Sequence, residues 1–389
     1  MKLSDPVFTK RFSSVFCLIL SVAVLAVPVL YLALPSSDYS PEENRMLATM
    51  PSMSPDTLLS GQYPQGLSDY LRDRLPFRST LLRVKSTAEY AALKRENNHV
   101  IMADHAYWVK RFSYTKDQQT MLQQNATALD RLAEALRGDQ APSVFVCAPR
   151  AIDVLQDFCP TNSTEPYEIW PAIPSPYGKA ITSLLRQKAN AGESVWFRTD
   201  HHWTPLGAYY AYSVLGAALG YTPYPKEAFF ETEVSHTFLG TAHSAGLAPF
   251  CRPDRIVVFR YEGDDSLVCT DMSTGESHMG LYCESALSQK DQYEYFLGKN
   301  TAHLRIQKDP HAPRPTLLLI KDSYAQSLAP FLARHFDIEM LDPRYFRTDM
   351  TPTLHDILSS PHYAGSLILC NADTLTEDIG LDRIRPENL

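Results

Sequence analysis

The sequence predicts an α/β fold, a three-layer α/β/α arrangement around a mainly parallel sheet. Short, continuous apolar runs are typical of strands that are buried on both faces, as in a parallel sheet. These runs alternate along the chain with segments of helical periodicity, and such alternation indicates a doubly wound, layered architecture. The apolar runs are residues 143–147, 194–197, 256–259, 316–320, 337–341 and 366–370, and the helical segments are 117–137, 177–191, 205–219 and 326–335.

Composition excludes several classes of protein. The chain has 389 residues, of which 44% are hydrophobic and 21% charged, so it can bury a sizeable core. Disorder, collagen and coiled coil are therefore excluded for the chain as a whole. Lys and Arg number 36 against 44 Asp and Glu. An acidic chain without a basic run is not expected to bind nucleic acid. The GxGxxG and GxxxxGK[ST] phosphate-binding patterns are also missing, so no nucleotide or other cofactor is expected.

The first element in chain order is an apolar segment at residues 12–34, which contains 23 residues without a charged side chain. A helix of this length spans about 35 Å, enough to cross a hydrocarbon core. Lys2, Lys10 and Arg11 precede it, which predicts a cytoplasmic tail over residues 1–11, a transmembrane anchor over 12–34 and an extracytoplasmic location for the rest of the chain. We therefore expect a single-pass protein of the cell membrane. The alternative, a cleaved signal peptide, fits less well because its apolar core is usually shorter.

Beyond this segment the chain changes character. Residues 35–99 are expected to form a stalk with two packing helices, at 67–75 and 80–95, and residues 100–389 the α/β domain. Residues 262–305 are rich in Asp, Ser, Gly and Tyr and lack periodicity, so we expect a long surface excursion there. Six cysteines follow the apolar segment and permit up to three disulfides. Cys147 and Cys370 lie in predicted buried strands, where core thiols are expected.

The densest polar cluster is Asp200-His201-His202-Trp203, which follows a predicted strand and precedes Pro205. Proline suits the first turn of a helix, so the cluster lies on a strand-to-helix loop, where α/β sheets bind ligands. In an Asp-x-His triplet the carboxylate can hold Nδ1–H of the imidazole and leave Nε2 as a base. From the residues alone, three interpretations are open: a base dyad, a metal site, or histidines that only form local hydrogen bonds.

A second turn carries a serine. Residues 316–320 run into Lys321, Asp322, Ser323 and Tyr324, and a helical pattern follows. A serine at the carboxyl end of a strand presents its hydroxyl, and nearby amides can stabilise an oxyanion. The alternative is that Asp322 or Ser323 only caps the helix. If both turns lie at one sheet edge, the combination predicts Ser-His-Asp catalysis.

At these residues the sequence resembles the DHHW protein family, which is named for the tetrapeptide that begins at Asp200. That family is similar to the alginate O-acetyltransferase proteins, which have an SGNH-hydrolase-like domain. Further family landmarks are residues 70–78, 149–150, 281–300, 321–325 and 341–346, so the resemblance extends from about residue 40 to about residue 375. It implies an SGNH-hydrolase-like fold in which Asp200 orients the base His202, and Ser323 is the nucleophile.

The resemblance also implies a function. We expect a membrane-anchored O-acetyltransferase that modifies a cell-surface polysaccharide through an acetyl-serine, with a membrane-bound O-acyltransferase as acetyl donor. The alternatives are an acetyl-esterase with the same triad, a non-catalytic polysaccharide-binding or assembly factor, and a metal-dependent hydrolase. Trp203, Tyr324 and Arg150 are the expected substrate-binding residues, the first two as sugar-stacking faces, and no metal ligand is expected. One departure from related esterases is Lys321, which stands where they have glycine.

Overall fold

A computed structural model describes residues 6–33, 37–40, 45–111, 113–138, 141–161, 168–247, 250–309, 311–312, 314–347, 349–359 and 363–380. The chain divides into two compact units, residues 1–93 with 247–249, and residues 94–246 with 250–389. The elements of the first unit are α1 (Pro6–Ala33), β1 (Tyr39–Ser40), β2 (Arg45–Met46), α2 (Pro55–Leu59), α3 (Gln62–Asp73) and α4 (Arg78–Ala91). Helices α3 and α4 correspond to the two predicted packing helices.

The described part of the N-terminal apolar segment, residues 12–33, is helical and belongs to α1, which begins at Pro6 and so also includes Lys10 and Arg11. Within the described part of the chain, no helix combines the length and the apolarity that crossing a bilayer requires. The transmembrane anchor expected over residues 12–34 is therefore not found.

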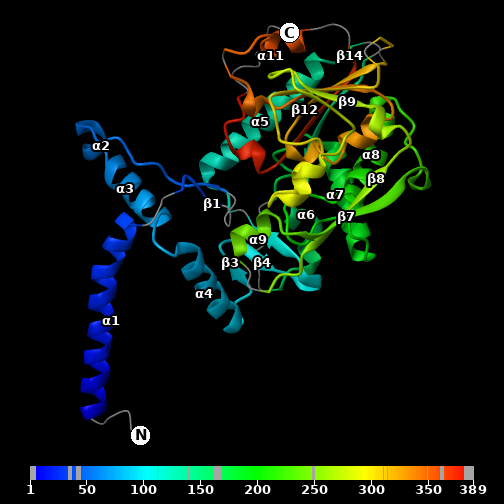
Figure 1. Ribbon diagram of the computed structural model, residues 1–389. Helices are drawn as coiled ribbons and strands as arrows, with labels where there is room; N and C mark the ends of the chain where they lie inside the picture. The colour runs from blue at the N-terminus through cyan, green and yellow to red at the C-terminus, as the bar shows by residue number, and fades with distance from the viewer. Residues whose placement is uncertain are drawn as a thin grey trace. The chain divides into compact units, whose positions relative to one another are not determined.

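A seven-stranded sheet organises the described residues of the second unit (Figure 1). In spatial order its strands are β10 (Ser277–Met279), β9 (Val268–Asp271), β11 (His303–Gln307), β13 (Asp337–Leu341), β12 (Thr316–Lys321), β14 (Tyr363–Asn371) and β6 (Ser143–Ala148). The last four strands are parallel, whereas β10, β9 and β11 pair antiparallel, and β11 joins β13 antiparallel. The sheet is mixed and not mainly parallel, because residues 262–305 supply β9, β10 and the start of β11 and are not a surface excursion.

Helices cover both faces of this sheet. Side chains alternate along each strand, so Phe145 and Cys147 of β6 face one apolar cluster while Val146 and Ala148 face the other. The first cluster includes side chains of α5 (Lys116–Ala135) and α11 (Leu354–Leu358), and the second those of α6 (Ala151–Leu155), α7 (Pro176–Asn190), α8 (Pro205–Leu219) and α10 (Ala329–Leu332). The predicted α/β class is confirmed, and burial on both faces explains the continuous apolar runs. As expected, Cys147 is a buried free thiol, as is Cys370.

Two predicted sheet strands lie elsewhere. Residues 256–259 belong to β8 (Asp254–Arg260), which pairs antiparallel with β7 (Phe230–Phe238) in a separate ribbon. Residues 194–197 form no strand of the large sheet. Both runs are apolar because they contribute to a third buried cluster, which contains Phe197, Ile256 and Val258. The remaining elements of this unit are the small sheet β3 (Glu96–Asn97), β4 (Val100–Met102) and β5 (Trp108–Lys110), and helix α9 (Thr241–Gly246).

Candidate active site

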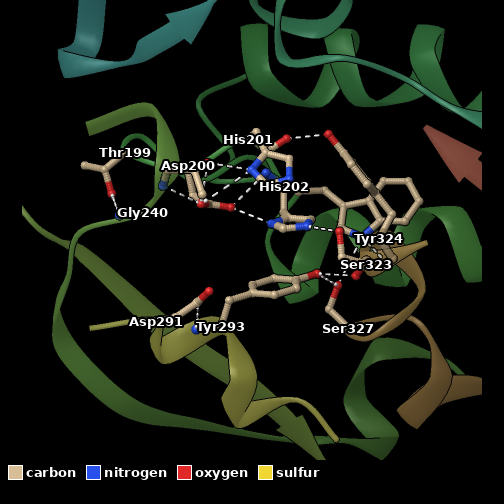
Figure 2. Close-up of polar contacts among 12 residues, drawn as sticks. Thr199, Asp200, His201, His202, Gly240, Asp291, Tyr293, Ser323, Tyr324 and Ser327 are labelled. Atoms are coloured by element: carbon tan, nitrogen blue, oxygen red, sulfur yellow. Dashed lines mark hydrogen bonds and ion pairs between the residues drawn. The ribbon is translucent and has the colours of Figure 1, made fainter. Parts of the chain in front are cut away.

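The two polar turns come together in the second unit. Ser323 Oγ lies 2.8 Å from His202 Nε2, and His202 Nδ1 lies 2.6 Å from Asp200 Oδ1. Figure 2 shows the His202 ring between the serine and the carboxylate. Hydroxyl, imidazole and carboxylate therefore form one continuous chain of hydrogen bonds, the order that a serine nucleophile with a general base requires.

A hairpin-like turn positions the aspartate and the histidines. Trp196 and Trp203 form an isolated antiparallel bridge, and the amide of Thr204 donates to Val195 O at 3.0 Å. Thr204 then caps α8 by accepting from the amide of Gly207, and a proline follows the cap. A Cβ on Gly207 would lie 2.3 Å from Val195 O, so only glycine lets the helix start so close to the turn. The bridge on one side and the start of α8 on the other thus hold the tip of the turn, residues 198–202, in place.

The nucleophile turn is held by Asp322. Its Oδ1 accepts from the amide of Tyr324 at 3.0 Å, and its Oδ2 accepts from the amide of Asn371 at 2.6 Å and from Thr374 Oγ1 at 2.8 Å. The capping role considered for this turn therefore falls to Asp322. Ser323 begins a short 3-10 helix and is partly exposed, while Asp322 and Tyr324 are buried. The serine is thus the side chain of the turn that a substrate can reach.

The backbone at Ser323 offers a donor for an oxyanion. Among the described residues, no hydrogen-bond acceptor meets the Ser323 N–H, whereas the amide of Tyr324 is taken by Asp322. Lys321, the departure noted in the sequence, is buried at the end of β12, where its Nζ donates to Asn300 Oδ1 at 2.5 Å and lies 3.5 Å from Asp342 Oδ2. The lysine therefore ties the strand to its neighbours.

Both carboxylate oxygens of Asp200 accept hydrogen bonds. Oδ1 accepts from the amide and Nδ1 of His202, and Oδ2 accepts from the amide of Thr241 at 2.8 Å and its Oγ1 at 3.1 Å. A Cβ on Gly240 would lie 2.3 Å from Asp200 Oδ2, so the glycine makes room for the carboxylate. Burial alone would raise the pKa of Asp200, but His201 and His202 outweigh it and hold this pKa well below its usual range. The carboxylate stays ionised.

The two histidines differ in their surroundings. Their ring centroids are 3.8 Å apart, but the His202 side chain is 5% exposed and the His201 side chain 35%. Burial and the neighbouring His201 lower the pKa of His202 to about 4, against the raising effect of Asp200. The pKa of His201 is raised, since Asp200 outweighs the effect of burial. His202 is therefore a neutral imidazole at neutral pH, with Nε2 available as a base.

Sequence reasoning missed Tyr293. Its ring stacks on that of His202, with centroids 3.9 Å apart and an interplanar angle of 5°. Its hydroxyl lies 3.1 Å from Ser327 Oγ and donates to Ser323 O at 3.3 Å (Figure 2). The tyrosine thus contacts both turns. It lies in residues 262–305, which lack periodicity and were expected to form a surface excursion, and the tyrosines of this segment were the one signal that could have pointed to burial.

The three residues expected to bind substrate are packed inside the protein. Trp203 is fully buried, and its Nε1 donates to Tyr324 O at 3.2 Å and to Ser327 Oγ at 3.0 Å. Tyr324 is buried too, and its hydroxyl donates to His201 O. Protein atoms therefore cover the aromatic faces expected to stack on sugar, and Trp203 instead links the two turns.

Arg150 is buried beside the start of α6. Its Nε and Nη2 donate to the two carboxylate oxygens of Asp153 at 2.9 and 2.7 Å. Such a bidentate pair compensates the cost of burying both charges. In this structure the arginine thus stabilises the chain after β6, and it is not placed at an open surface as the substrate-binding residue that the sequence predicts.

The same polar cluster contains potential metal ligands. One ligand atom from each of Asp200, His201 and His202 lies within 4.8 Å of the others. However, His202 uses Nδ1 for Asp200 and Nε2 for Ser323. A metal bound through His202 would displace one of these contacts, so the geometry favours acid–base chemistry over metal binding.

Comparisons with known proteins agree with this fold. None of the curated proteins matches the chain. Among solved structures, a DHHW family protein from Eubacterium siraeum is 17% identical with a TM-score of 0.52, and the match covers 74% of this chain and 96% of that one. PatB1 from Bacillus cereus, solved with a sulfonyl adduct, is 17% identical with a TM-score of 0.57 and coverages of 73% and 99%.

A third structure, the O-acetyltransferase domain of Pseudomonas putida AlgJ, is 15% identical with a TM-score of 0.43 and coverages of 74% and 96%. The first two similarities indicate a shared fold. A sequence profile of the family described as DHHW protein matches residues 90–341, which is more than half of the chain. The chain therefore belongs to the DHHW family.

Proposed function

We propose that this chain is a serine-dependent O-acetyltransferase that modifies a cell-surface polysaccharide through an acetyl-serine intermediate. The observation that carries the proposal is the chain of hydrogen bonds from Ser323 through His202 to Asp200. Nucleophile, base and orienting carboxylate lie at the distances that acyl transfer needs.

In the first half-reaction, Ser323 Oγ attacks the carbonyl carbon of an acetyl donor while His202 Nε2 takes the hydroxyl proton. The carbonyl electron pair moves to the oxygen, and the Ser323 N–H donates to this oxyanion. The intermediate then collapses, the bond to the donor's leaving group breaks, and that group takes the proton from His202. Asp200 stays ionised throughout and stabilises the imidazolium.

In the second half-reaction, a sugar hydroxyl gives its proton to His202 and attacks the acetyl carbonyl. The bond to Ser323 Oγ breaks, and the serine recovers its proton from the imidazolium. Water in place of the sugar gives the same steps with acetate as product, which is the acetyl-esterase alternative. Only the acceptor distinguishes the two activities, since both use the same three residues.

The donor and the acceptor come from the family resemblance. We propose a membrane-bound O-acyltransferase as acetyl donor, a polysaccharide as acceptor, and a location outside the cytoplasm. Ser323 is partly exposed, which is compatible with delivery of an acetyl group from a second protein. By analogy with the sulfonyl adduct of Bacillus cereus PatB1, we also propose that a sulfonyl fluoride reacts with Ser323.

Trapping the intermediate tests the proposal. The protein is incubated with p-nitrophenyl acetate without an acceptor, quenched in acid and mapped by peptide mass spectrometry. We expect an acetyl group on Ser323 that is absent in Ser323→Ala and retained in Ser288→Ala, which changes an exposed serine. Absence of acetyl-serine in folded protein would exclude both serine-dependent activities and leave the metal-dependent hydrolase and the non-catalytic polysaccharide-binding or assembly role.

Two additions separate the remaining alternatives. An acceptor oligosaccharide that takes acetyl faster than water identifies a transferase, and acetate alone identifies an esterase. Activity that survives Ser323→Ala but disappears with EDTA would instead support the metal-dependent hydrolase.

A further inference from the structure

Beside the catalytic turn lies a pocket of about 250 Å³, between residues 194–206 and the ribbon of β7 and β8. Pockets for drug-sized ligands start at roughly 300 Å³. This pocket is somewhat smaller, so it suits a ligand of about one sugar residue. Its lining combines aromatic and cationic side chains. The residues that matter here are Trp196, Phe197, Phe259, Arg198, Arg252 and Arg255.

The pocket shares its wall with the active site. Trp196 bridges to Trp203 in the turn that carries the histidines. The ring of Phe197 meets that of Tyr293 edge to face at 6.4 Å, and Tyr293 stacks on His202. One short segment of backbone therefore lines the pocket on one side and holds the base on the other.

The acidic groups of the lining are already engaged. Asp254 is 3% exposed and accepts from the amides of Arg198 and Thr199 and from Thr199 Oγ1, at 2.9, 2.7 and 2.6 Å. Glu231 pairs with Lys226 at 2.9 Å. Neither carboxylate therefore needs a further cation from the pocket.

Two arginines of the lining, Arg252 and Arg198, have guanidinium N–H groups that can donate to a ligand. Arg255 pairs with Glu233, but Arg252 is exposed and its guanidinium meets no acid among the described residues. The guanidinium of Arg198 lies 5.9 Å from the centroid of the Tyr107 ring and donates through Nε to His105 O at 3.3 Å, and its terminal NH groups have no acceptor in the described part of the chain. A guanidinium of this kind matches a carboxylate or phosphate with two parallel hydrogen bonds.

The buried indole N–H of Trp196 is a further donor at this pocket. Trp196 is 1% exposed, and its Nε1 donates to no acceptor among the described residues. Buried indole N–H groups usually have a partner. Trp196 lines the pocket, and an oxygen-rich ligand there is the acceptor that this N–H lacks. Trp196, Phe197 and Phe259 are only 1%, 1% and 5% exposed, so their rings form the apolar floor of the pocket and are not open stacking faces.

We propose that this pocket binds an anionic sugar residue of the acceptor polysaccharide, with Arg252 and Arg198 on the anionic group. This inference rests on the proposed function, because it names the class of acceptor. The chain as a whole carries a net charge of −8 and repels an anionic glycan. A local cationic pocket, on the other side of the turn that holds the base, overcomes that repulsion.

Binding to the full-length Ser323→Ala variant tests the pocket, because this variant cannot form acetyl-serine. Isothermal titration uses three probes: tetragalacturonate, a glycerol-phosphate tetramer and neutral maltotetraose. We expect at least one anionic probe to bind about tenfold more tightly than maltotetraose, and the stronger one identifies carboxylate or phosphate as the group recognised. Adding Arg252→Ala should weaken that binding about tenfold.

The matched control is Arg131→Ala, which changes an exposed arginine of α5 and should leave binding unchanged. Equal affinity for neutral and anionic probes, no measurable binding, or binding indifferent to Arg252→Ala each overturns the proposal. Since the titration needs no nucleophile, a failed acetyl-serine experiment with intact anionic binding would reject the enzyme and keep the pocket.

Discussion

The position of one proton on the His201–His202 pair controls whether Ser323 can react. A single carboxylate, Asp200, faces both rings, and it cannot stabilise two imidazolium ions 3.8 Å apart. The proton goes to His201 because this ring is 35% exposed and solvated, while the His202 ring is 5% exposed. His202 therefore stays neutral, as a base must.

A pH profile of Ser323 reactivity tests this distribution. Because the pKa of His202 is lowered to about 4, its neutral form predominates above that pH and disappears below it. We expect the labelling rate with phenylmethanesulfonyl fluoride to stay high above about pH 5 and to fall about tenfold per pH unit below about 4. His201→Gln removes the neighbouring charge, so the pKa of His202 rises and the fall moves to higher pH.

The control variant must lie away from the groups that face these two rings. Asp200, Asp322 and Tyr293 face His202, while Asp200, Lys110 and Asp373 act on His201. His236→Gln changes an exposed histidine of β7 and should leave the profile unchanged. An acid limb that stays in place in His201→Gln would disprove the assigned proton position.

Tyr293 offers a second prediction for a single residue. Tyr293→Phe keeps the ring on His202 and loses only the hydroxyl contacts, so labelling of Ser323 should fall by less than about threefold. Tyr293→Leu removes the stacked ring, and because such aromatic contacts contribute roughly 0.5–1.5 kcal/mol, the rate should fall about tenfold. Equal rates in the two variants would show that the ring does not position the imidazole.

At the scale of elements, the start of α9 matters as much as the catalytic turn. Gly240 precedes this helix, and Thr241 begins it and donates to Asp200. Gly240→Ala would put a Cβ 2.3 Å from Asp200 Oδ2, so the carboxylate must move away from His202. We expect labelling of Ser323 to fall at least about tenfold while circular dichroism stays unchanged.

Gly138→Ala is the control, because its Cβ would meet nothing closer than 3.6 Å. A Gly240→Ala variant as reactive as the unaltered protein would mean that Asp200 is not held by this close approach.

The sequence could predict the turns but not all of their supports. Asp200, His202 and Ser323 follow apolar runs, but only the run before Ser323 is a sheet strand, so only this residue marks the sheet edge that the pattern predicts. Tyr293 and Gly240 lie in segments without periodicity, so their contacts depend on tertiary packing that no local pattern encodes. The run at residues 194–197 was misread as a sheet strand because a buried turn and a buried strand have the same apolar composition.

At the scale of the whole molecule, the parallel half of the sheet was predictable and the antiparallel half was not. Strands β6, β12, β13 and β14 are continuous apolar runs, because helices cover both of their faces. Strands β9 and β10 are short and polar, so they carry no such signal.

Whole-molecule stability should respond to Asp373, which accepts a hydrogen bond from Tyr114. Burial raises the pKa of Asp373 to about 6, although Tyr114, Arg150 and Lys110 oppose the shift. A raised carboxyl pKa destabilises the folded state as pH rises from about 4 through 6. Asp373→Asn should therefore raise Tm at pH 7.5 and leave it unchanged near pH 4, as thermal unfolding can measure.

Asp265→Asn, at an exposed aspartate, is the comparison and should show no such pH-dependent gain. A lower Tm for Asp373→Asn at pH 7.5 would mean that the ionised carboxylate stabilises the fold.

The account depends most on Ser323, His202 and Asp200 acting as one unit. The direct measurement is the rate of Ser323 labelling by phenylmethanesulfonyl fluoride in the unaltered protein, His202→Gln, Asp200→Asn and the double variant. Residues of one relay are strongly non-additive, so each single change should lower the rate by about a hundredfold or more, and the double variant should be no slower than the slower single one. Full labelling in His202→Gln, or losses that multiply in the double variant, would contradict it.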